Sequence, residues 1–152
     1  MKRWAVIAAL AAALSSPALA DDQSHAPYAP RLNSIMIGIQ LGHFKLWYAG
    51  IVRNWDLANY ELTLIKTAFE DGKKYYPNLP MADMSTLTQP ADELGDAIKA
   101  KDGAKFTKAF ERLTAECNTC HQAAGLGFIV IRTPRLSPIE TSPLSDEAFS
   151  PK

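Results

Sequence analysis

The chain has only two cysteines and three histidines among its 152 residues. The cysteines are Cys117 and Cys120, and His121 follows them directly. A structural zinc site takes four ligands, and only His25 and His43 remain to complete such a set. A thioredoxin-like dithiol requires a βαβ context, whereas the alternation of apolar and polar residues that marks strands is nearly absent here. The scarcity of cysteine and histidine therefore disfavours a zinc site, and the lack of strand patterns disfavours a thioredoxin-like site.

Clusters of positive charge are also missing. Lys and Arg number 16, Asp and Glu number 16, and the two signs are mixed along the chain. A protein that binds nucleic acid usually gathers its basic residues on one face, so this composition predicts no nucleic-acid partner. Neither a paired acid site nor a Ser-His-Asp pattern stands out. We therefore do not expect a hydrolytic or transfer enzyme.

Long apolar runs are limited to the N-terminus. A Lys-Arg pair lies in residues 1–3, residues 4–14 form an Ala-rich apolar run, and residues 18–20 are Ala-Leu-Ala. This order is typical of a secretory signal peptide with a small-residue cleavage site. The run is shorter than the roughly 20 apolar residues that span a bilayer, although a retained N-terminal anchor is the alternative. We expect residues 1–20 to be removed on export to the periplasm, which leaves one domain without a stable membrane span.

The motif Cys117-Asn118-Thr119-Cys120-His121 is the attachment sequence of c-type haem. Two thiols three residues apart lie on nearly the same face of a helical turn, so both can form thioethers with one porphyrin. The next residue, His121, then projects toward the iron as an axial ligand. The predicted signal peptide agrees with a haem c site, because haem c is attached outside the cytoplasm. The sequence therefore predicts one covalent haem c, bound through Cys117 and Cys120, whose iron is ligated by His121.

Four stretches of the chain repeat apolar residues in alternating steps of three and four. This period places the apolar residues on one side of an α-helix, which can then pack against neighbouring helices. The four stripes are Leu32, Met36, Ile39, His43, Leu46 and Gly50; Trp55, Ala58, Leu62, Ile65 and Phe69; Leu87, Ala91, Leu94 and Ile98; and Phe106, Phe110, Leu113, Cys117 and Cys120. Because the last stripe ends on the motif cysteines, we expect the haem to lie inside a bundle near one end.

Short breaks separate the four stretches. Asn54 is expected to cap the second helix, and Pro90 can open the third because proline is tolerated in a first turn. Short connections favour antiparallel neighbours. The predicted fold is all-α: an antiparallel up-down-up-down four-helix bundle over residues 31–122.

A Pro-rich segment, residues 123–152, follows the predicted bundle. We expect it to form an irregular tail that packs on the bundle. Its apolar run, residues 128–131, is expected to fold back over the haem end and exclude water. The alternative is a strand-like or disordered tail.

A four-helix bundle with C-x-x-C-H near the end of its last helix resembles the cytochrome c′ and cytochrome c-556 family. The resemblance covers residues 31–122, and its haem motif is highly specific. The chain departs from the family in having few basic residues after His121 and in its additional tail. The resemblance implies a periplasmic mono-haem cytochrome that binds haem and transfers electrons to redox partner proteins. It also implies that homodimers can form, because bundles of this family often pair through helix faces.

The sixth iron ligand separates an electron carrier from a gas binder, because methionine ligation gives a low-spin iron with a raised potential. Met36 and His43 compete for this role. At 1.5 Å per residue they lie about 8 Å and about 18 Å into the first helix, and the second depth exceeds that of the haem centre. Depth therefore favours Met36, and His43 is expected to be a core histidine bonded to a backbone carbonyl or a haem propionate. The resemblance implies the same ligand, because cytochromes c-556 use a methionine early in this helix.

Two alternative functions remain open. In the cytochrome c′ branch an apolar residue, here Ile35 or Ile39, blocks the sixth position, and the resemblance then implies a protein that binds NO or CO. The second alternative is a haem subunit that docks on a larger redox complex through its tail.

Overall fold

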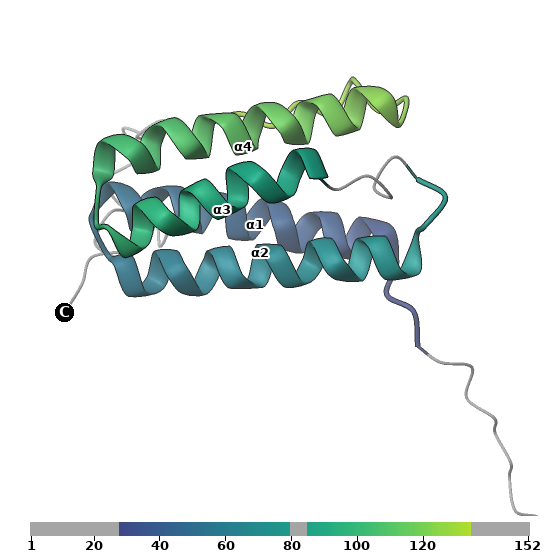
Figure 1. Cartoon of the computed structure of the whole chain (residues 1–152). Coiled ribbons are helices and arrows are strands. Elements are labelled where there is room, and N and C mark those ends of the chain that lie inside the picture. Colours follow the sequence, from purple (N-terminus) through teal and green to yellow (C-terminus); the bar gives the residue numbers. More distant parts are fainter. Residues whose placement is uncertain (1–27, 80–84, 135–152) are drawn as a thin grey trace, which may run out of the picture.

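The computed structural model describes residues 28–79 and 85–134, and this part of the chain contains four helices and no strand. They are α1 (Leu32–Ile51), α2 (Trp55–Tyr75), α3 (Ser85–Lys99) and α4 (Gly103–Ala123). Consecutive helices run in opposite directions (Figure 1). α1 packs mainly on α2 and α3 mainly on α4, while contacts of α2 with α3 and of α1 with α4 complete the bundle. The predicted all-α, up-down-up-down four-helix bundle is confirmed. The predicted signal peptide lies outside the described residues, as does the tail beyond residue 134.

The helix ends follow from short polar side chains and tight turns. The side-chain oxygen of Asn54 accepts a hydrogen bond from the Leu57 amide at 3.2 Å, which confirms Asn54 as the N-cap of α2. Asp102 caps α4 in the same way by accepting from the Ala104 and Lys105 amides. The two caps start α2 and α4 directly after a turn, so neighbouring helices lie antiparallel.

The start of α3 was predicted wrongly. The helix begins at Ser85, so Pro90 lies inside it and does not open it. Proline lacks an amide hydrogen and removes one hydrogen bond near the start of the helix, at the carbonyl of Thr86. Thr86 is exposed, so water can bind this carbonyl, whereas the Pro90 ring is fully buried and adds to the core. Packing therefore outweighs the missing hydrogen bond.

The core is built from the predicted stripes. Its largest fully buried apolar side chains come from all four helices: Leu46, Ile65, Leu94, Phe106, Phe110 and Leu113. α1 and α4 approach closely at Gly50, where a Cβ atom would lie 2.1 Å from the ring of Phe106. Only glycine leaves room for that ring. The haem-motif cysteines lie at the edge of this core and are partly buried.

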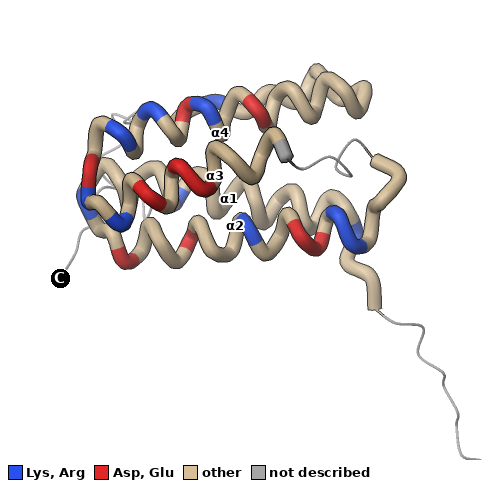
Figure 2. Tube along the Cα trace, in the orientation of Figure 1, with Lys and Arg blue, Asp and Glu red and all other residues tan. Residues whose placement is uncertain are grey.

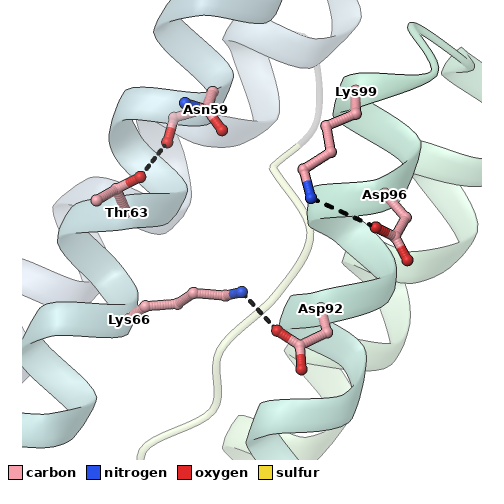
Figure 3. Close-up of polar contacts among 6 residues, drawn as sticks. All are labelled: Asn59, Thr63, Lys66, Asp92, Asp96 and Lys99. Carbon is pink, nitrogen blue, oxygen red and sulfur yellow. Dashed lines mark hydrogen bonds and ion pairs between the residues drawn. The ribbon is translucent and has the colours of Figure 1, made fainter.

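Charged residues are distributed unevenly over the bundle. α1 contains one charged residue, Lys45, and none of residues 117–131 is Lys, Arg, Asp or Glu (Figure 2). Charges instead lie on α2, α3 and the first part of α4, where Lys66 of α2 pairs with Asp92 of α3 at 2.6 Å (Figure 3). Of the helices in the described ranges, none is long and apolar enough to cross a membrane.

Candidate functional site

The haem motif occupies the last turns of α4, as its position in the fourth stripe predicted. Cys117 and Cys120 are both free thiols, partly buried, and both pack against the core. Burial raises the pKa of the Cys117 thiol to about 12, with the neighbouring Cys120 adding to the effect, and burial also raises the pKa of Cys120. Both thiols are therefore protonated at neutral pH. A redox-active dithiol shows the opposite behaviour, because its nucleophilic cysteine has a lowered pKa.

His121 is oriented by a backbone carbonyl. Its Nδ1 lies 2.8 Å from the carbonyl oxygen of Ile129. A carbonyl oxygen can only accept a hydrogen bond, so Nδ1 carries the proton and donates it. Nε2 then keeps a free lone pair. Histidines that bind metals are held in this way, with the second ring nitrogen donating to a carbonyl or carboxylate.

The segment that carries this carbonyl is the return strap, residues 124–131, which runs back beside α4 (Figure 1). Gly125 adopts a φ of 72°, in the left-handed region that favours glycine, and this conformation helps to reverse the chain after α4. At its far end, the Asn118 side chain donates to the Ile131 carbonyl at 2.9 Å and accepts from the Ile131 amide at 2.7 Å. The strap is therefore tied to the motif at two of its residues, Asn118 and His121.

Two apolar side chains of the strap are largely exposed. Phe128 is 80% exposed and Val130 is 57% exposed. The strap thus lies against α4 through its backbone, while its own side chains contribute little to the core. That residues 128–131 exclude water from a haem stays a prediction.

His43 is buried and is bonded to α4. Its Nε2 lies 2.8 Å from the Thr114 hydroxyl oxygen, and the Thr114 hydroxyl donates to the Phe110 carbonyl at 2.9 Å. The hydroxyl proton is thereby used, so Nε2 of His43 is the donor to Thr114. Burial lowers the pKa of His43 to about 4, which keeps the ring neutral near pH 7. The predicted core histidine is confirmed, but its partner is a threonine hydroxyl, and its Nε2 is occupied by that bond.

The contacts between α1 and α4 define their register. His43 meets Thr114, and four residues further along α1 the ring of Trp47 lies 4.9 Å from that of Phe110, four residues back along α4. The two helices therefore run antiparallel, and a step of four residues along α1 matches a step of four residues back along α4. Seven residues back from His43 is Met36, and seven residues forward from Thr114 is His121. Met36 and His121 therefore occupy matching positions in this register.

Met36 shares one line of α1 with residues that contact α4. Positions 36, 43, 47 and 50 share one line along the helix, and the last three contact α4. Ile35 lies two helical turns before Gly42, on the line that faces α2, because a Cβ at Gly42 would lie 3.1 Å from Ile65. Ile35 is buried in the core, whereas Met36 is only partly buried. Of these two neighbours, Met36 is the one directed toward α4.

These residues fit a haem c. Two free thiols three residues apart, an imidazole with Nε2 available, and a thioether side chain level with it on the facing helix are the groups that such a cofactor takes from a protein. Within residues 28–79 and 85–134, no three His, Cys, Asp or Glu side chains gather to hold a metal ion. A haem iron needs no such cluster, because the porphyrin supplies four of its ligands.

Two features of the site escaped the sequence reasoning: the carbonyl of Ile129 and the side chain of Asn118. Every residue has a carbonyl, so a backbone acceptor leaves no signal in the residue types. Comparison of the chain with protein-family models, curated proteins and solved structures gives no match.

Proposed function

We propose that this chain is a periplasmic, mono-haem c-type cytochrome of the cytochrome c′ and cytochrome c-556 type, which carries electrons between redox partner proteins. One observation supports the proposal above the others. The Nδ1–H of His121 is held by the Ile129 carbonyl while Nε2 is available, and His121 directly follows two free thiols with thioether spacing. The motif and the orientation of the His121 ring are independent observations, because the Ile129 carbonyl that orients the ring is not part of the motif.

Each site residue has a defined part in this function. Cys117 and Cys120 would hold the porphyrin through thioethers, and His121 and Met36 would be the protein's ligands to its iron. The haem, when bound, takes up and releases one electron at its iron. His121 and Met36 lie on helices whose register is set by buried contacts, such as the His43–Thr114 hydrogen bond. A fixed ligand pair needs little rearrangement when the iron changes its oxidation state.

The proposal is tested on the full chain, expressed in a host that exports it and attaches haem c. We expect one haem per chain, and an alkaline pyridine spectrum typical of a haem with two thioethers. The C117A/C120A double variant serves as the control and should carry no covalent haem. A wild-type protein without covalent haem would refute the proposal.

The same preparation distinguishes the carrier from the gas binder. Methionine ligation predicts a low-spin ferric spectrum with the far-red charge-transfer band of a Met–iron bond, and slow binding of CO by the ferrous protein. High-spin spectra with immediate CO binding would instead establish the gas-binding reading. Co-purification with a larger complex, lost on deletion of residues 128–152, would establish the subunit reading.

A further inference from the structure

The Asn118 side chain connects the haem motif to the return strap. We propose that Asn118 is a positioning residue for His121: by holding the strap, it holds the Ile129 carbonyl against the imidazole Nδ1–H and thereby sets the reduction potential of the haem. This inference rests on the proposed function. It assigns a role to a residue at one of the two variable positions of the motif.

Asn118 uses both of its amide hydrogens and its oxygen. Nδ2 donates to the carbonyls of Thr114, at 3.0 Å, and Ile131, at 2.9 Å. Oδ1 accepts from the Ile131 amide at 2.7 Å. The side chain thus pairs with the amide and the carbonyl of one backbone residue at once, which requires a group that both donates and accepts. A carboxylate cannot donate, and an alanine can do neither.

The strap is attached to α4 at both of its ends. Its near end is fixed by the Leu126 amide, which donates to the His121 carbonyl at 2.8 Å. Its far end is fixed by Asn118 at Ile131, and Ile129 lies between the two attachments. Phe128 and Val130 are exposed and provide little packing that could replace the lost bonds. The Ile129 amide also donates to the Leu126 carbonyl at 2.8 Å. Loss of the Asn118 side chain therefore leaves this turn in place but frees the strap beyond it, and the Ile129 carbonyl loses one of its two supports.

The Ile129 carbonyl acts on the iron through the imidazole. A hydrogen bond from Nδ1–H raises the basicity of a metal-bound histidine and fixes the rotation of its ring. A more basic ligand donates more charge and stabilises the ferric over the ferrous state. Hydrogen bonding around the ligands is one of the means by which a protein tunes a haem potential. Loss of the Asn118 pairing should therefore raise the potential.

The test compares N118A with T119A in the full, haem-loaded chain. Thr119 is the other variable motif position, and its hydroxyl donates to the Ala115 carbonyl of its own helix. T119A thus changes the motif without touching the strap. We expect the wild type and both variants to carry one haem, and T119A to keep the wild-type potential. In N118A, the Fe(II)-to-Fe(III) ratio at a fixed ambient potential should rise about tenfold, which is a shift of about 59 mV for one electron. The His121 Nδ1 proton, observed by NMR, should exchange with solvent at least about tenfold faster.

A second variant approaches the same contact from the strap. I131P removes the amide that donates to Asn118 and leaves α4 unchanged, so it should raise the potential and speed the exchange of the His121 Nδ1 proton, as N118A does. It replaces N118A if that variant fails to mature. Unchanged potential and exchange in haem-loaded N118A or I131P, even with a lower melting temperature, would overturn the role of Asn118 and leave the proposed function intact. A wild-type chain without haem would overturn both.

Discussion

The two ends of the α1–α4 contact are built from different interactions. At the end remote from the motif, the aromatic end, Trp47 packs on Phe110 and the buried ring of Phe106 fills the space left by Gly50. At the motif end, Met36 and the two cysteines are only partly buried, and the return strap is held by hydrogen bonds to backbone groups. Burial thus stabilises one end, while directed hydrogen bonds orient His121 and hold the return strap at the other. Substitutions should therefore affect stability at the aromatic end and ligand geometry at the motif end.

The largest loss of stability is expected for F106A. The ring is fully buried and contacts Gly50, Trp55 and Phe110. Its removal should lower the free energy of unfolding by about 3–5 kcal/mol, measured by urea denaturation. Residues 117–121 lie at the other end, so a haem bound as proposed should keep the wild-type spectrum in the folded fraction. A loss below about 1 kcal/mol would show that the aromatic end does not dominate the core.

His43 lies between the two ends and should make stability depend on pH. Its pKa falls from 6.5 to about 4 on folding, so the unfolded chain binds more protons between these values. The free energy of unfolding should then decrease as pH falls from about 6.5 to 4, by about 3 kcal/mol in total. The variant H43Q keeps an amide donor for Thr114 but cannot titrate. An equal pH dependence of urea denaturation in the two proteins would contradict this assignment.

The aromatic end could be predicted from the sequence because packing follows residue type and spacing. The stripes indicated the four helices, the buried Phe106 and Phe110, and the core position of His43. The location of the motif on the last turns of α4 followed from the same periodicity. The start of α3 did not follow from this periodicity, because burial of Pro90 outweighed its local preference for a first turn.

The motif end was only partly predictable. The spacing of the cysteines and the depth of Met36 follow from helix geometry, but the hydrogen bonds to the strap do not. An asparagine on a helix is as compatible with solvent as with a backbone partner, and only the path of residues 124–131 decides between them. Contacts made by backbone groups depend on the path that the chain takes, which the residue types of the segment do not specify.

M36A should separate stability from ligand geometry. Met36 is partly buried, so its truncation should cost only about 1 kcal/mol, below the range for fully buried methionine. Under the proposed function, the visible spectrum should nevertheless change from that of a six-coordinate low-spin iron to that of a five-coordinate high-spin iron. L32A is the matched control, because Leu32 is also partly buried and lies one turn earlier on α1. An unchanged spectrum in M36A would limit Met36 to packing.

The smallest effect on stability is expected for F128S. This ring is 80% exposed, and the strap is attached through Asn118 and His121 and not through its own side chains. The free energy of unfolding should therefore change by less than about 0.5 kcal/mol, and the reduction potential should stay at the wild-type value. L113S, which places the same residue at a buried position of α4, should cost several times more. If F128S and L113S were similarly destabilised, the strap would be held by packing, and the contrast between the two ends of the bundle would not exist.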